Sequence, residues 1–130
     1  IEKSKTRLKM IEQNAIQLGV PLLKIVSGTL PDVLEHLPLP DAIFVGGGIA
    51  NSKRKGSSSL LDICWKLLKP GGRLVAHAVT FETEQQLLNW HKKHRGDLTR
   101  LSISRADSIG KYQGWKPLRP VTQYSVTKEY

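Results

Sequence analysis

Three consecutive glycines, Gly46, Gly47 and Gly48, follow directly after the apolar run 42–45 of this 130-residue chain. Glycine lacks a Cβ atom, so a glycine run permits either a tight turn or a close approach of the backbone to a bound molecule. A turn needs one or two glycines, and three in succession after a buried strand favour the approach to a ligand. The run is not a phosphate loop, because it lacks the Lys-Ser/Thr pair of the P-loop and the G-x-G-x-x-G spacing.

Two further segments place chemically useful groups at the predicted ends of strands. Glu2 precedes a predicted helix, where a carboxylate either binds the two hydroxyls of a ribose or faces the positive end of the helix dipole. Gly28, Thr29 and Leu30 follow a short apolar segment, where the backbone either lies against an adenine ring or turns into a helix. Ligands of α/β sheets bind beyond the carboxyl ends of the strands, so these segments and the glycine run are candidate parts of one cleft.

The elements that must position these residues alternate between helix and strand. Caps and apolar spacing predict helices that begin near Ser4, near Pro31, at one of Ser57–Ser59, and at Thr80 or Thr83. Between them, apolar segments predict strands over 23–26, 42–45 and 73–79. The continuous apolar run 42–45 is typical of a strand that is buried on both faces of a parallel sheet.

The pattern changes in the C-terminal third of the chain. Residues 98–105 and 121–127 alternate between apolar and polar, which is typical of half-buried strands. We expect them to form an antiparallel pair at the edge of the parallel sheet, joined by a long loop over 106–120 that carries Tyr112 and Trp115. The predicted fold class is therefore α/β, with a mostly parallel sheet and a terminal antiparallel strand pair.

Composition narrows the choice of partners. The net charge of +9 favours an acidic partner, either nucleic acid or an acidic small molecule, or marks a solvated basic face. No apolar run is long enough to cross a bilayer, so we expect no membrane partner. The single cysteine, Cys64, lies on an apolar helical stripe and fits a reducing, cytoplasmic setting. His91 and His94 lack a third ligand nearby in sequence, so we expect no metal.

Several motifs together resemble one enzyme family over nearly the whole chain. The glycine run belongs to F-V-G-G-G, the segment 68–74 reads L-K-P-G-G-R-L, and the segment 78–82 reads A-V-T-F-E. The chain closes with P-V-T-Q-Y-S-V-T-K over 120–128. The second motif is common among class I S-adenosylmethionine (SAM) methyltransferases, whereas the combination resembles the C-terminal, decarboxylating methyltransferase domains of the precorrin-6Y C5,15-methyltransferase family.

The resemblance implies a Rossmann-like, SAM-dependent C-methyltransferase domain that acts on a precorrin in cobalamin biosynthesis, with associated decarboxylation. It implies cofactor contacts from Glu2 at the ribose, from Gly28, Thr29 and Leu30 at the adenine, and from Gly46, Gly47 and Gly48 beside the methyl donor. It also implies catalytic positions at His77, Thr80 and Glu82. His77 stands where the family usually has Asn; it can donate, accept or move a proton, and the alternative is a histidine packed beside the sheet.

The family also has a first strand and a glycine-rich loop upstream of the position that Glu2 matches. We therefore expect this chain to be an N-terminally truncated part of a larger polypeptide that binds SAM weakly or not at all by itself. Its exposed sheet edge should be covered by rearranged pairing within the chain or by another copy, and an upstream domain or a homo-oligomer is the expected protein partner.

A polycarboxylate tetrapyrrole substrate would give the basic charge a role, because Lys and Arg pair with carboxylates. The candidates for this contact are Lys53, Arg54, Lys55 and Arg105, and Trp115 and Tyr112 could stack on the macrocycle. The competing hypothesis is a nucleic-acid methyltransferase or binding domain, although the chain lacks the Asn/Asp-Pro-Pro-Tyr motif and an aromatic platform. A nicotinamide-dependent dehydrogenase is a third alternative, which the terminal antiparallel pair disfavours.

Overall fold

The computed structural model describes residues 1–50 and 59–129, without the side chains of residues 35 and 36. It divides the chain into two compact units, Ile1–Pro38 and Leu39–Tyr130.

The first unit consists of one helix, α1 (Lys5–Gln17), and a short 3-10 helix, η1 (Asp32–His36). Ser4 caps α1 as expected, because its hydroxyl accepts a hydrogen bond from the backbone N–H of Arg7. The strand expected over 23–26 is absent from this unit, and a single parallel bridge joins Glu2 to Ser27 instead. A strand needs a partner of similar length, and the extended segment around Glu2 is too short to supply one.

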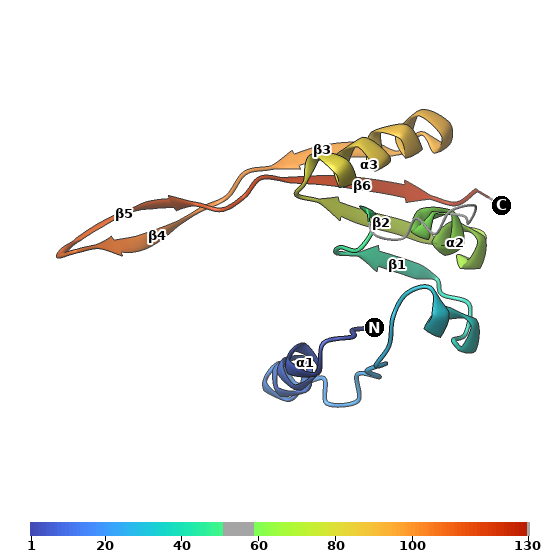
Figure 1. Cartoon of the computed structure of the whole chain (residues 1–130), viewed down its shortest axis with the longest axis horizontal. Helices are drawn as coiled ribbons and strands as arrows, with labels where there is room; N and C mark the ends of the chain where they lie inside the picture. The colour runs from blue at the N-terminus through green and yellow to red at the C-terminus, as the bar shows by residue number, and fades with distance from the viewer. Residues whose placement is uncertain (51–58, 130) are drawn as a thin grey trace. The chain divides into compact units, whose positions relative to one another are not determined.

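The second unit is built on a four-stranded sheet in the order β1-β2-β6-β3 (Figure 1). The strands are β1 (Ala42–Val45), β2 (Arg73–Ala78), β6 (Val121–Thr127) and β3 (Asp97–Leu101). β1 and β2 are parallel, whereas β6 is antiparallel to both β2 and β3. The predicted α/β class is confirmed, and so is the antiparallel pair at one edge of the sheet. The sheet is mixed rather than mostly parallel, because β1 and β2 form the one parallel pairing among its described strands.

Two helices accompany this sheet, α2 (Leu60–Leu67) and α3 (Phe81–His94). Ser59 and Asp62 form a capping box at the start of α2. At the end of α2, the Lys128 ammonium donates hydrogen bonds to the carbonyl oxygens of Trp65 and Leu68, at 2.8 and 2.6 Å. Arg95 ends α3 with a φ of 58°, a conformation that normally requires glycine.

One face of the sheet holds the core of the second unit, and the other face is more open. Along β2 and β6, every second side chain is buried, and the buried positions lie opposite one another: Leu74 with Val126, Ala76 with Tyr124, and Ala78 with Thr122. Cys64 of α2 is also buried, as expected. The prediction that β1 is buried on both faces is wrong, because the Phe44 side chain is 63% exposed on the open face.

β1 forms an edge of this sheet. It pairs with β2 alone among the described residues of the second unit. The rearranged pairing expected to cover this edge is therefore absent from the described part of that unit, and cover by another copy stays a prediction.

The long loop expected over 106–120 is instead a β-hairpin of β4 (Ser104–Ile109) and β5 (Tyr112–Pro117). It extends beyond the four-stranded sheet as a separate two-stranded arm (Figure 1). Gly110 has a φ of +59° and opens the two-residue turn, where the twist of a hairpin favours a left-handed residue. The expected strand over 98–105 is accordingly split, and its two parts belong to β3 and β4.

Candidate functional site

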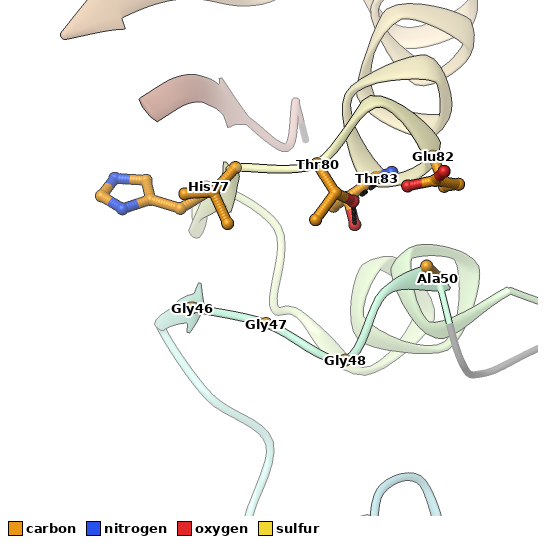
Figure 2. A pocket seen from close by; sticks show the side chains of 9 residues that line it. Gly46, Gly47, Gly48, Ala50, His77, Thr80, Glu82 and Thr83 are labelled. Carbon is orange, nitrogen blue, oxygen red and sulfur yellow. Dashed lines mark hydrogen bonds between the residues drawn. The ribbon is translucent and has the colours of Figure 1, made fainter. Parts of the chain in front are cut away.

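A pocket of about 430 Å³ lies at the carboxyl ends of β1 and β2 (Figure 2). Its wall consists of the segment that follows β1, the end of β2 and the first turn of α3. The lining residues are Gly46, Gly47, Gly48, Ala50, His77, Val79, Thr80, Glu82 and Thr83. The structure thus brings the glycine run together with all three residues expected to be catalytic.

The glycine run forms a side of the pocket with open space beside it. A Cβ atom at Gly47 or Gly48 would meet no other atom within 4 Å, whereas one at Gly46 would lie 3.1 Å from the Phe44 ring. Gly48 also has a φ of +81°, so its backbone conformation itself favours glycine. The turn explanation therefore holds at Gly48, and the approach of a ligand to the open space beside Gly47 stays a prediction.

The first turn of α3 contributes hydroxyl groups and a carboxylate. The Thr80 hydroxyl caps the helix by accepting a hydrogen bond from the Thr83 backbone N–H at 3.3 Å. The backbone N–H of Glu82 and then the Thr80 hydroxyl hold the pKa of the Glu82 carboxyl below its usual value. Glu82 is therefore a carboxylate at neutral pH, and it accepts hydrogen bonds or faces a positive charge rather than donating a proton.

His77 lies at another part of the pocket wall. Its Nε2 atom is 2.9 Å from the Oε1 atom of Gln123, and its ring meets the Phe44 ring edge-on with the centroids 4.8 Å apart. Figure 2 shows the imidazole pointing away from Thr80 and Glu82. His77 therefore lines the pocket without directing its ring at the hydroxyl and carboxylate groups of α3.

The other predicted cofactor residues lie together in the first unit. The backbone N–H of Glu2 donates to the Val26 carbonyl oxygen at 3.0 Å, and that of Gly28 donates to the Glu2 carbonyl oxygen at 3.1 Å. The Ser4 backbone N–H and then that of Lys3 donate to the Glu2 carboxylate, and these bonds lower its pKa.

Gly28 has a packing reason to be glycine, and its two neighbours differ in exposure. A Cβ atom at Gly28 would lie 2.2 Å from Val33 Cγ1, so this position packs against η1. Thr29 is exposed and Leu30 is partly buried. The cofactor roles of Glu2 and of residues 28–30 stay predictions.

Of the predicted substrate residues, Arg105 and Trp115 are described by the structure, and neither is in the pocket wall. Lys53 and Arg54, with Lys55, lie outside the described residues. Arg105 and Trp115 lie on the hairpin, and the strand register places them on opposite faces, because Arg105 pairs with Lys116 whereas Trp115 pairs with Ala106. One ligand face therefore cannot meet both side chains of a single hairpin, and the substrate role of each stays a prediction.

The sequence did not reveal all of the pocket. Ala50 and Val79 have hydrocarbon side chains, which do not mark them as site residues, and Thr83 was considered only as a possible helix cap. Gln123 was missed as a site residue because its contact with His77 depends on the β2–β6 register, and these two positions are 46 residues apart in the chain.

Two further properties concern the described residues as a whole. No helix there is both long and apolar enough to cross a membrane. The same residues contain no group of three or more His, Cys, Asp or Glu side chains that could hold a metal ion.

Comparison with known proteins gives matches along nearly the full chain. A family profile described as a precorrin methyltransferase domain matches residues 1–128. A precorrin-6Y C(5,15)-methyltransferase [decarboxylating] from Sinorhizobium sp is 45% identical over 128 residues, which are 98% of this chain and 30% of that protein. The chain therefore spans about 30% of the length of that relative.

Two solved structures resemble the fold. The C-terminal domain of precorrin-6Y C5,15-methyltransferase from Rhodobacter capsulatus is 39% identical with a TM-score of 0.79, and the match covers 98% of this chain and 66% of that one. A SAM-dependent O-methyltransferase from Thermotoga maritima is 18% identical with a TM-score of 0.63, covering 99% of this chain and 49% of that one. At this identity the second match concerns the fold alone.

Proposed function

Because the chain belongs to the precorrin methyltransferase domain family, we propose that its protein transfers a methyl group from SAM to a carbon of a precorrin in cobalamin biosynthesis, with associated decarboxylation. The observation that carries this proposal is the pocket at the carboxyl ends of β1 and β2, which brings Gly46–Gly48 together with His77, Thr80 and Glu82. This is the edge at which α/β sheets bind ligands.

The residues present fit SAM, which supplies a methyl group on a positively charged sulfur when it is bound. The free space beside Gly47 and Gly48 supports a close approach of their backbone to the methyl donor. Ionised Glu82 offers a negative charge in the same pocket. In the first unit, Glu2 would bind the ribose hydroxyls, and Gly28, Thr29 and Leu30 would lie against the adenine.

The substrate would be a tetrapyrrole with several carboxylates. Because Glu82 repels carboxylates, these groups would be held by basic side chains away from the first turn of α3. Lys53 and Arg54 are proposed contacts for these carboxylates. Arg105 and Trp115 are proposed as alternatives, the first for a carboxylate and the second for stacking, because they lie on opposite faces of the hairpin. The net charge of +9 favours the encounter with such a substrate.

Methyl transfer to such a substrate requires no covalent bond between the protein and the substrate. A carbon of the reduced macrocycle is electron-rich, so the chain's task is to align it and to exclude water. In the decarboxylation, the C–C bond of an acetate side chain breaks, carbon dioxide leaves, the electron pair enters the conjugated ring and a proton then replaces the lost group. His77 and Thr80 are the proposed groups for moving or orienting that proton, because Glu82 is ionised.

The test uses the full-length protein with SAM and a precorrin-6Y-type substrate, and mass spectrometry follows the product. We expect a mass gain of one methyl group per transfer and the loss of carbon dioxide. Glu82→Gln should reduce turnover by about tenfold or more, because it removes the negative charge from the pocket. Glu12→Gln, on the exposed side of α1, is the matched control. Wild-type protein that transfers no methyl group to the precorrin would refute the proposed function.

A further inference from the structure

We propose that Glu84 is a positioning residue, whose side chain fixes the first turn of α3, and with it part of the pocket wall, against the sheet. The starting observation is that one carboxylate oxygen of Glu84, Oε1, has partners on two strands. It accepts a hydrogen bond from the Thr122 hydroxyl of β6 at 3.1 Å, and it forms an ion pair with the Arg100 guanidinium of β3. Because Glu84 belongs to α3, this carboxylate joins the helix to both strands.

The strand register brings the two donors together. Arg100 lies directly opposite Thr122 in the antiparallel pairing of β3 with β6, so their side chains leave the sheet on the same face. Thr122 belongs to the buried face of β6, and α3 packs against β2 and β6. Main-chain pairing therefore fixes the point on the sheet to which the Glu84 carboxylate is attached.

The backbone of Glu84 closes the helical turn that lines the pocket. Its N–H donates to the Thr80 carbonyl oxygen at 2.9 Å. Thr80, Glu82 and Thr83 of the same turn are pocket residues. Without the contacts of the Glu84 side chain, this turn would be attached to the sheet by the chain that follows β2 and by the packing of buried Leu87, one turn further along α3.

Stability alone does not require a carboxylate at this position. The Glu84 side chain is only 21% exposed, and a charge that leaves water loses hydration that an ion pair does not always repay. An apolar side chain of similar length would avoid this cost. The ion pair adds direction instead, because the oxygen must lie where both donors reach it.

This positioning role deepens the proposed function and rests on it. Thr80 is proposed to move or orient a proton, and Glu82 is proposed to offer a negative charge in the pocket. Both side chains act on a ligand only if their turn is held at a fixed distance from Gly46–Gly48 across the pocket. Glu84 would supply that placement without touching the ligand.

The first test is hydrogen exchange of the full-length protein, followed by mass spectrometry of peptides that cover the first turn of α3. The variant is Glu84→Met, which keeps the length of the side chain and removes the acceptor. We expect it to fold, because the Arg100 side chain is 60% exposed and its charge stays in water. The protection of the Thr83 and Glu84 amides, which donate to Thr80, should fall by about tenfold, and the protection of β2 should stay unchanged.

Two further variants control this experiment. Glu84→Gln should keep nearly the wild-type protection, because the carboxamide oxygen still accepts from both donors. Lys69→Met removes the exposed ion pair with Asp41 at the amino ends of β1 and β2 and should leave the first turn of α3 unchanged. Full protection of the turn in Glu84→Met, or an equal loss of protection in β2, would overturn the proposal.

The second test measures turnover with SAM and the precorrin substrate at a temperature at which all variants are folded. Glu84→Met should lower kcat by about tenfold, and Glu84→Gln should stay within about twofold of the wild type. A purely structural role would change stability and leave the kcat of the folded protein unchanged. An unchanged kcat in a Glu84→Met protein that has lost the protection of its first turn would therefore overturn the positioning role and leave the proposed function intact. Conversely, a wild-type protein without methyl transfer would refute the proposed function, while the exchange experiment would still decide whether Glu84 holds the turn.

Discussion

Substitution of Gly47 and Gly48 by alanine separates the two roles of the glycine run. A methyl group at Gly47 meets no atom within 4 Å and its φ is not in the left-handed region, so Gly47→Ala should leave the free energy of unfolding unchanged or raise it by about 0.4–1 kcal/mol. Gly48→Ala should lower it by about 1–2 kcal/mol, because the φ of +81° disfavours a side chain. Both positions line the pocket, so the affinity for SAM should fall by about tenfold in both variants, equivalent to about 1.4 kcal/mol.

Calorimetric titration with SAM and denaturant unfolding of the full-length protein measure these two quantities. Gly110→Ala is the matched control, because Gly110 also has a positive φ and open space around it but lies at the tip of the hairpin. The Gly110→Ala control should destabilise the turn of the hairpin and keep the wild-type affinity for SAM. A Gly47→Ala variant that binds SAM as tightly as the wild type would refute the assignment of this backbone to the cofactor.

Four other substitutions or treatments have defined outcomes. Lys128→Met should lower the free energy of unfolding by about 2 kcal/mol, measured by denaturant unfolding, because the last carbonyl groups of α2 lose a charged donor. Arg95→Gly should raise it by about 1 kcal/mol in the same assay, since the strained backbone is relieved at the cost of a more flexible unfolded chain. Cys64 should resist alkylation at pH 8 until the protein unfolds, because burial raises its pKa to about 11. Thr80→Val should raise the pKa of the Glu82 carboxyl toward its ordinary value, because it removes a hydrogen bond to the carboxylate. In the wild type the pKa is lowered, so Glu82 stays ionised at and above its ordinary pKa and becomes protonated only as the pH falls through the lowered pKa. A titration followed by nuclear magnetic resonance measures both values.

Local signals predicted those parts of the fold that depend on neighbouring residues. Ser4 caps a helix as predicted, and Ser59 and Thr80 are the caps among the alternatives that the sequence offered, Ser57–Ser59 and Thr80 or Thr83, because a cap requires only the next few backbone N–H groups. The hairpin was missed because the alternation over 98–105 continues through the break between β3 and β4 without a glycine or proline. Gly110 between Ile109 and Tyr112 was the signal available for its turn.

The sequence could predict those parts of the candidate site that follow directly after parallel strands, because the carboxyl ends of such strands meet at one edge of a sheet. Gly46–Gly48 and Thr80 follow two parallel neighbours, so their proximity depends only on the order of β1 and β2. The contact of His77 with Gln123 depends on the exact register of two distant strands, which no local pattern encodes. For the same reason, the sequence could not indicate that Arg105 and Trp115 lie on opposite faces of a hairpin.

The one-sided burial of the sheet also bears on how this domain can change during evolution. Leu74, Ala76 and Ala78 are buried, whereas Val75 and His77 between them are partly exposed. In saturation mutagenesis of β2, tolerance to substitution should therefore alternate along the strand. The buried positions should accept almost no replacement, and the positions between them should accept many. Along such a strand, the codons of the open face are where new ligand preferences can accumulate without loss of the fold.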